Sequence, residues 1–358
     1  MTDITQRKAD HLDLATRGDV GFRRTTTLFD CIELVHDALP ELDFSALDTG
    51  LELFGKKLSA PILIAAMTGG HERAERINKE LASIAEELGL AFGLGSQRAM
   101  HTKPHTRGSY SVRDVAPNAL ILGNLGVVQA AKMSTAEIRD LMQEVGADAV
   151  CIHLNPAMEL VQDDGDRDFR GGMATLVRLV NELGLPIIAK ETGSGLSAHV
   201  GRRLRAAGVR HVDVSGAGGT SWVAVETERS HSRRKEIGQT FREWGIPTAA
   251  SVGLVSRFGF ETVFATGGVQ NGLDVAKAIA LGASAGGIAR PTLQALEQGG
   301  RDGALAFLAR IEEELRVAML LTGSADLAAL RRAPKLVFGH LREWLEQLGS
   351  GAARGTTP

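Results

Sequence analysis

The chain has 358 residues, of which 44% are hydrophobic and 23% are charged, and its formal net charge is −3. These fractions are those of an ordinary soluble globular protein, and the small net charge gives no reason to expect nucleic acid or an anionic membrane surface as a partner. No apolar run approaches the ~18 residues needed to span a bilayer, and the polar, charged start of the chain is unlike a secretory signal. The two cysteines, Cys31 and Cys151, form neither a disulfide framework nor a metal-ligand pattern, so we expect a protein of the reducing cytoplasm.

Residues 1–30 form a basic, polar arm ahead of the first apolar run. Beyond it, short apolar or β-branched runs that end in Gly- or Ser-rich turns alternate with helical patterns. We predict eight strands, at residues 61–66, 91–95, 119–123, 148–153, 186–190, 210–214, 262–265 and 284–288. The segments between them have apolar residues at the three- and four-residue spacing of an amphipathic helix and close on glycine or Gly-Ala. The clearest of these helical segments are 77–89, 134–147, 172–184 and 273–283.

This alternation predicts an α/β fold, with a closed (β/α)₈ TIM barrel favoured over an open doubly wound sheet. Strands that are nearly all apolar and alternate with helices indicate a parallel sheet covered by helices. No GxGxxG follows the first strand, which argues against a dinucleotide-binding Rossmann domain. We therefore expect residues 1–350 to form a single barrel domain.

Two regions interrupt or extend the barrel. The charged stretch 226–245 breaks the sixth unit and is expected on the catalytic face, where lids are found. Residues 304–348 predict two further helices, and the tail 350–358 is expected to be disordered. The segment 247–251 (PTAAS) predicts the start of a helix rather than a ninth strand.

The segment 265–291, ATGGVQNGLDVAKAIALGASAGGIARP, is the most informative part of the sequence. Gly267, Gly268 and Val269 follow the seventh strand, and Ala289 with Arg290 follows the eighth. TIM barrels commonly form a phosphate site from these two loops, because backbone N–H groups point at the anion and glycine lets them approach closely. The pattern is similar to that of flavin-mononucleotide barrels and the inosine monophosphate dehydrogenase group, so we expect a flavin or nucleotide phosphate. The alternative is that these glycines only permit tight turns.

Polar groups at the other strand ends suit an isoalloxazine ring, which needs donors at its polar edge, an apolar floor and a nearby cation. The residues at these ends are Met67 and Thr68 after the first strand, Ser96 after the second, Asn124 after the third, Lys190 after the fifth, and Ser215 with Thr220 after the sixth. Lys190 ends the apolar strand PIIAK, and we expect it to point into the barrel mouth, since burying an ammonium is costly without a partner. The alternatives are that Lys190 closes its strand at the surface and that Ser96 or Asn124 caps a helix.

A second constellation suits an anion such as diphosphate. It consists of Arg7, Lys8 and His11 in the arm, Ser96, Gln97 and Arg98 after the second strand, and His153 and Asn155 after the fourth. Arginine binds phosphate through paired N–H donors and lysine supplies a point charge, so these groups could converge if the arm folds over the barrel mouth. Glu159, on the loop after the fourth strand, could hold Mg²⁺ against such a ligand. Taken alone, the arm residues could equally be a solvated charged stretch and Glu159 an exposed loop glutamate.

Eight segments together resemble the type 2 isopentenyl diphosphate isomerases. They are 7–11 (RKADH), 60–70 (APILIAAMTGG), 93–98 (GLGSQR), 123–126 (GNLG), 153–156 (HLNP), 189–195 (AKETGSG), 213–222 (DVSGAGGTSW) and 266–283 (TGGVQNGLDVAKAIALGA). The match runs from the arm to the last strand in the family's order. RKxxH and GSQR in particular separate this family from other flavin barrels.

The resemblance implies conversion of isopentenyl diphosphate to dimethylallyl diphosphate without net oxidation, with reduced FMN, Mg²⁺, and NADPH as the reductant. It implies that FMN contacts Ala66 and the strand-end residues given above, that Arg7, Lys8, Ser96, Gln97 and Arg98 hold the diphosphate, and that Glu159 binds Mg²⁺. The double bond moves through a state of tertiary-cation character, which an electron-rich ring beside Lys190 can stabilise. Glu226 is a candidate to assist proton movement. The family also implies a homotetramer or homo-octamer.

The chain departs from the family at two positions. Met158 stands where the family has glutamine before the magnesium glutamate, and a thioether cannot donate a proton. Gln162, four residues later, is a candidate substitute. Gln270 stands where the phosphate loop usually carries arginine, although backbone donors could still hold the phosphate. Met158 therefore keeps an alternative open, an FMN enzyme of the same ancestry that acts on another prenyl diphosphate or in a redox reaction. A 2-hydroxy-acid oxidase and a non-catalytic flavin-binding protein are further alternatives.

Overall fold

The computed structural model describes residues 4–230 and 232–349, without the side chains of residues 4–9 and 17. The predicted tail 350–358 lies outside the described residues.

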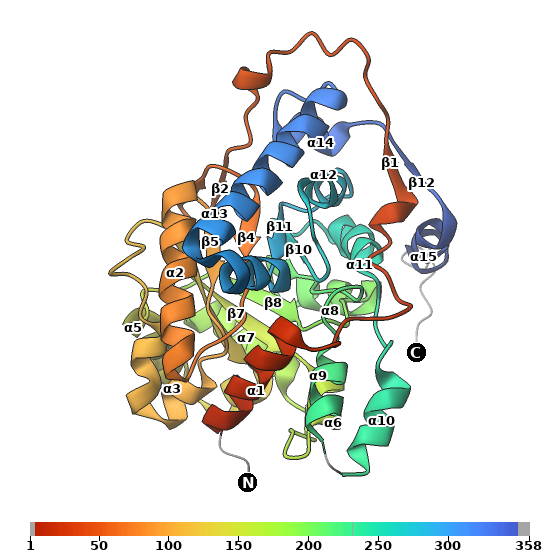
Figure 1. Ribbon diagram of the computed structural model, residues 1–358. Coiled ribbons are helices and arrows are strands. Elements are labelled where there is room, and N and C mark those ends of the chain that lie inside the picture. Colours follow the sequence, from red (N-terminus) through yellow and green to blue (C-terminus); the bar gives the residue numbers. More distant parts are fainter. Residues whose placement is uncertain (1–3, 231, 350–358) are drawn as a thin grey trace.

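Eight parallel strands close into a barrel, with the order β10-β11-β4-β5-β6-β7-β8-β9 (Figure 1). Their bounds are β4 Ile62–Ile64, β5 Ala91–Gly93, β6 Leu120–Gly126, β7 Ala149–Leu154, β8 Ile187–Glu191, β9 His211–Asp213, β10 Thr262–Thr266 and β11 Ala285–Ile288. The barrel strands are buried along nearly their whole length, as expected of a parallel sheet with helices on the outside. All eight strands lie where the sequence predicts them, so the (β/α)₈ prediction is confirmed.

The helices that cover the barrel follow its strands in the chain. They are α2 Glu72–Leu88, α3 Arg98–Thr102, α4 Val127–Lys132, α5 Thr135–Glu144, α6 Pro156–Val161, α7 Gly172–Glu182, α8 Ala198–Ala206, α9 Trp222–Arg229, α10 Arg234–Phe241, α11 Thr248–Val255, α12 Gly272–Ala280 and α13 Arg290–Leu321. Local signals explain their ends: α2 stops at Gly89, whose φ of 63° is left-handed, and α5 begins with a capping box of Ser134 and Glu137. The helix predicted at 247–251 is α11.

The C-terminal region contains more elements than the two predicted helices. α13 changes direction at Gly300 and continues to Leu321. It is followed by α14 (Leu327–Arg332), β12 (Lys335–Val337) and α15 (Gly339–Gly349). β12 pairs antiparallel with β1 (Ile32–Leu34), near the other end of the chain. This pairing sets Glu33 opposite Leu336. No local sequence pattern predicts it, because the two strands lie so far apart in the chain. A hairpin of β2 (Leu51–Leu53) and β3 (Lys56–Leu58) precedes the barrel.

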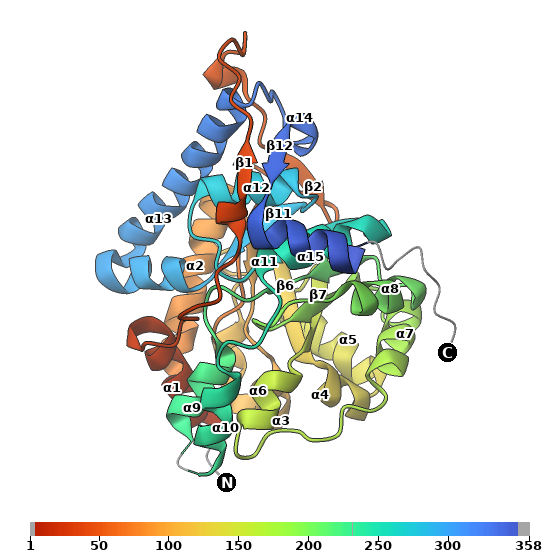
Figure 2. The same cartoon turned by 90° about the vertical axis from the view of Figure 1, so that its right-hand side faces the viewer.

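The N-terminal arm contains α1 (Ile4–Arg17), which packs against α9 and α13. Figures 1 and 2 both place α1 beside α9, at the end of the molecule that also carries α3, α6 and α10. β1, β12 and α14 lie at the opposite end (Figure 1). The arm therefore lies across the face where the barrel strands end. Within the described chain, no helix is both long and apolar enough to cross a membrane.

The charged insertion 226–245 folds as the end of α9 and as α10, which pack on each other and on α6. Its Glu243 accepts hydrogen bonds from the backbone N–H groups of Arg23, Arg24 and Thr25 at 2.9 Å. Burial by itself would raise the pKa of Glu243, but these donors outweigh it and lower the pKa to about 2. Arg242 donates to the backbone oxygens of Asp19 and Gly21. The insertion therefore holds the arm in place, and none of its described residues lines the cavity below the arm.

Candidate active site

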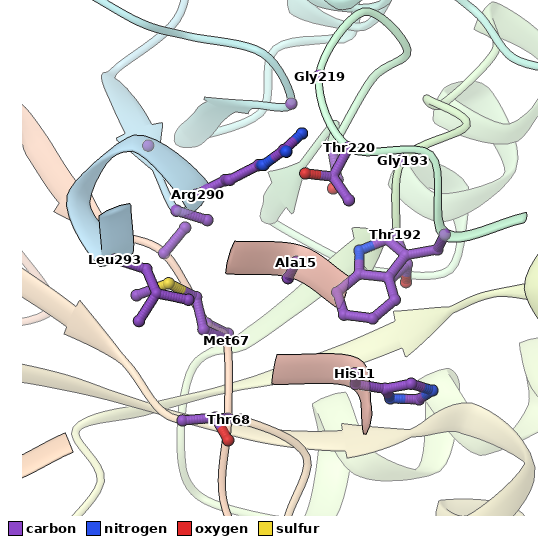
Figure 3. Close-up of a pocket in the computed structure, with 18 of the residues that line it drawn as sticks. His11, Ala15, Met67, Thr68, Thr192, Gly193, Gly219, Thr220, Arg290 and Leu293 are labelled. Atoms are coloured by element: carbon purple, nitrogen blue, oxygen red, sulfur yellow. The ribbon is translucent and has the colours of Figure 1, made fainter. Parts of the chain in front are cut away.

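A cavity of about 640 Å³ opens at the carboxyl ends of the barrel strands (Figure 3). This volume is within the range of roughly 300–1,000 Å³ that is usual for small-molecule and cofactor sites. His11, Leu12 and Ala15 of α1 close it on one side. The predicted site residues on its wall are Ala66, Met67, Thr68, Ser96, Arg98, Asn124, His153, Asn155, Met158, Glu159, Lys190, Ser215, Thr220, Gly267, Gly268, Val269, Ala289 and Arg290. The structure thus brings most of the predicted residues to one place.

Two of the predicted residues whose side chains the structure describes, Gln97 and Glu226, are not on that wall. The side chains of Arg7 and Lys8 lie outside the described residues, so their predicted contacts with substrate stay predictions. Gln97 is fully buried, and its Oε1 accepts from the backbone N–H of Asn124 at 2.8 Å. Glu226 is also buried and lies behind the cavity wall. Gln97 therefore supports the backbone of β6, and Glu226 contacts the cavity residue His11; their predicted roles stay predictions.

The loops predicted to hold the phosphate approach each other through their backbone. A Cβ atom added to Gly219 would lie 2.4 Å from the nitrogen of Gly268, so the loops after β9 and β10 pack main chain to main chain. Gly268 has a φ of 77°, a conformation that favours glycine. Figure 3 shows Arg290 extended across the cavity toward Gly219 and Thr220. Its Nη2 donates to the backbone oxygen of Gly18, while its buried Nε has no partner among the described residues. An unused arginine donor beside a glycine cradle fits the phosphate of FMN.

Lys190 is the cation predicted for the ring. It is 8% exposed, and its Nζ lies 2.9 Å from Asp213 Oδ2 and 3.1 Å from the backbone oxygen of Glu191. Asp213 in turn accepts from the hydroxyl of Thr266 and from the backbone N–H of Ser215. Ser215 has a φ of 37°, which is rare for a residue other than glycine and marks a constrained turn at the cavity. The prediction that Lys190 points into the barrel mouth is confirmed.

Two other buried acids near Lys190 do not face the cavity. Burial raises the pKa of the Cys151 thiol to about 12, so the thiol stays neutral. Burial also raises the pKa of Glu191 to about 7, although the backbone N–H groups of Ser194 and Thr192 oppose this by donating to its carboxylate. The charged groups in direct contact at this end of the cavity are Lys190 and Asp213.

Asn124 fixes the tautomer of His153. Its Nδ2 donates to the backbone oxygen of Leu94, so its Oδ1 must accept from His153 Nδ1 at 2.8 Å. An amide oxygen can only accept, and His153 Nδ1 therefore carries the proton.

The predicted magnesium ligand lies on α6 and not on a loop, because Pro156 starts a short helix directly after β7. Glu159 is 7% exposed, and its two oxygens accept from Asn155 Nδ2 at 3.0 Å and from the backbone N–H of Asp166 at 2.8 Å. No cluster of three or more acidic, histidine or cysteine side chains that could hold a metal occurs in the described chain. A single buried carboxylate still fits Mg²⁺, which usually keeps several waters and binds one or two carboxylates together with substrate phosphates.

His11 links the arm to the barrel. Its Nε2 lies 2.6 Å from Glu226 Oε1, and Arg229 Nη1 donates to the other oxygen of Glu226 at 2.7 Å. The His11 ring meets Trp222 edge to face, with ring centroids 5.4 Å apart. Since His11 and Trp222 line the cavity and Glu226 does not, Glu226 positions His11. The RKADH and TSW segments contained both cavity residues, but a sequence does not show that they meet.

The chain is similar to known proteins over almost its whole length. Residues 2–107 and 155–336 match the FMN-dependent dehydrogenase family. The isopentenyl-diphosphate delta-isomerase of Halobacterium salinarum is 45% identical over 354 residues, 97% of each chain. The enzyme of that name from Methanothermobacter thermautotrophicus is 42% identical over 347 residues, again 97% of each chain. The one from Synechococcus is 44% identical over 334 residues, 92% of this chain and 96% of the relative.

Solved structures agree on the fold. A mandelate oxidase mutant with a monooxide FMN adduct superposes with a TM-score of 0.65 at 19% identity, covering 91% of this chain and 95% of the other. A putative lactate oxidase of Pediococcus acidilactici gives a TM-score of 0.66 at 15% identity, with 94% and 93% covered. At these identities the likeness shows the barrel alone. Because it is 45% and 42% identical to two delta-isomerases over 97% of its length, the chain belongs to the FMN-dependent dehydrogenase family and, within it, to the isopentenyl-diphosphate delta-isomerases.

Proposed function

We propose that the protein isomerises isopentenyl diphosphate to dimethylallyl diphosphate, with FMN in its reduced form and with Mg²⁺. The observation that carries the proposal is that the lining of one cavity has two chemically different parts. Lys190 and the glycine loops at Gly219 and Gly268 make up one part of the lining, and Arg98, His153 and Glu159 make up the other. The first part suits a flavin and its phosphate, and the second suits a diphosphate with its metal.

Each part has a task in this reaction. When bound, reduced FMN supplies an electron-rich ring that stabilises positive charge on the substrate carbons. Lys190 orients and balances the charge of that ring, Arg98 and His153 bind the diphosphate, and Glu159 holds Mg²⁺ against it. α1 covers the cavity and excludes water from a cation-like state. NADPH as the reductant, a homotetramer or homo-octamer, and a cytoplasmic location belong to the proposal as well, and they rest on the family resemblance.

Met158 favours a second candidate, an FMN enzyme acting on another prenyl diphosphate or in a redox reaction. It lines the cavity beside Glu159, and its sulfur is 4.0 Å from Asn155 Nδ2. A thioether there can neither donate a proton nor hold a polar substrate group well.

The two candidates are separated by turnover of isopentenyl diphosphate with chemically reduced FMN and Mg²⁺, followed by NMR. We expect the wild-type protein to form dimethylallyl diphosphate and Met158→Gln to form it about twofold to tenfold faster, as one added hydrogen bond would give. If both proteins retain FMN and neither converts the substrate, the second candidate gains and the isomerase proposal fails.

Arg98→Ala tests the diphosphate part of the cavity. Arg98 is half-buried, and its nearest acid, Asp166, is 4.0 Å away, so most of its donors remain available to a ligand. Loss of charge-assisted hydrogen bonds should raise the KM for isopentenyl diphosphate roughly tenfold to a hundredfold, with FMN content unchanged. The matched control is Arg107→Ala, an exposed arginine that pairs with Glu144. An unchanged KM in the Arg98 variant would remove this residue from the substrate site.

A further inference from the structure

Helix α6 presents a row of polar side chains to the cavity. Asn155 caps the start of α6, Glu159 lies within it and Gln162 caps its end, at spacings of four and three residues that place them on one side of the helix. All three line the cavity and are at most 7% exposed. Met158, at the position before Glu159, lies one helical turn before Gln162.

The three members of this row differ in how their hydrogen-bonding groups are used. Asn155 donates to Glu159, and both oxygens of Glu159 have donors. The side-chain nitrogen of Gln162 is buried and has no hydrogen-bond partner among the described residues. A buried amide nitrogen without an acceptor destabilises a protein, so a retained one calls for an acceptor from elsewhere. Gln97 also has a buried, unpartnered amide nitrogen, but it is not on the cavity wall.

The main chain of Gln162 is held independently of its side chain. Its backbone oxygen accepts from Arg167 Nη2 at 2.8 Å and from the backbone N–H of Gly165 at 3.2 Å. Its backbone N–H donates to the oxygen of Met158. The side chain can therefore be exchanged without removing the contacts that fix this end of α6.

We propose that Gln162 is a ligand-binding residue of this cavity, whose side-chain amide turns to donate to a diphosphate oxygen beside Glu159. Arg98, His153 and Glu159 already provide cationic, donor and metal-binding groups for such an anion, and an amide N–H adds a neutral donor. Gln162 supplies, one turn along α6, the amide that Met158 lacks. The inference rests on the proposed function for the identity of the anion.

The test measures binding of inorganic diphosphate, with Mg²⁺, to the protein loaded with oxidised FMN, by titration calorimetry. Gln162→Met keeps the length of the side chain and removes its donor. We expect it to raise the Kd about tenfold, the effect of one hydrogen bond to a charged group. The matched control, Gln143→Met, changes an exposed glutamine of α5 and should leave the Kd unchanged.

A melting curve without diphosphate separates binding from folding. Because the amide nitrogen has no partner in the free protein, Gln162→Met should melt at the wild-type temperature or above it. An unchanged Kd overturns the proposal, whether or not the variant melts at a lower temperature. This test measures binding, whereas the test of the proposed function measures turnover. A protein that binds diphosphate through Gln162 but does not isomerise the substrate would therefore reject the proposed function and keep this inference.

Discussion

Lys190→Met should lower the turnover of isopentenyl diphosphate about a hundredfold to a thousandfold. The ammonium is almost completely buried at the end of β8, where its charge acts on the ring end of the cavity with little solvent screening. Removing one such preorganised electrostatic group typically costs a factor of about 10²–10³ in kcat. The measurement is kcat with reduced FMN at saturating substrate, together with the reduction potential of the bound flavin, which should fall because the anionic reduced ring loses its cation.

The same substitution leaves Asp213 buried without its ion-pair partner, which destabilises proteins by about 3–5 kcal/mol. A loss of activity could then reflect a loss of folded protein. Lys190→Met/Asp213→Asn is the matched control, because asparagine can still accept from Thr266 and Ser215 and carries no charge. We expect the double variant to recover most of the melting temperature and to keep the low kcat. Recovery of activity along with stability would show that Lys190 only neutralises Asp213.

The barrel and the position of Lys190 could be predicted because both depend on local patterns. A strand formed by a short apolar run is buried along its length, and the polar residue at its end lies at the edge of the barrel. Because the strands are parallel, all such ends lie on one face of the barrel. Lys190, Asn124 and Ser215 were found in this way. The positions of the glycines in 265–291 were equally informative, since close main-chain approach excludes other residues.

Side-chain direction could not be predicted where the chain turns into a helix. Ser96, Gln97 and Arg98 are consecutive, yet only Ser96 and Arg98 reach the cavity. Successive residues at the start of α3 point about 100° apart, and Gln97 turns inward to hold the backbone of Asn124. The GSQR motif grouped the three residues, because a sequence motif does not show in which direction each side chain points.

Long-range contacts were the other limit. The sequence suggested Glu226 for proton movement, but its partner His11 comes from an arm that lies 215 positions earlier in the chain. The insertion 226–245 lies on the catalytic face, as expected, but the sequence did not show that its Glu243 and Arg242 hold the arm. Both outcomes depend on how α1 docks against α9, which neither local pattern contains.

Glu159→Gln should raise the Mg²⁺ concentration needed for half-maximal turnover by about a hundredfold or more. Mutating groups that only support a metal ligand already costs about 10–100-fold in metal affinity, and Glu159 would be the ligand itself. Glutamine keeps the shape but lacks the negative charge that Mg²⁺ prefers. It can also satisfy only one of the two donors that now meet the carboxylate, Asn155 Nδ2 and the N–H of Asp166.

The lost acceptor should lower stability by about 1–3 kcal/mol, so the metal effect has to be measured apart from folding. Titration of Mg²⁺ against turnover, with the melting temperature and FMN content of the same samples, separates the two. Glu313→Gln, an exposed glutamate of α13, controls for the loss of one negative charge. A Mg²⁺ midpoint that stays at the wild-type value, in a variant that is fully folded and loaded with FMN, would move the metal away from α6. The diphosphate would then be held by Arg98, His153 and the arm. Glu159 would not contact it, because a carboxylate and a diphosphate repel each other unless a cation lies between them.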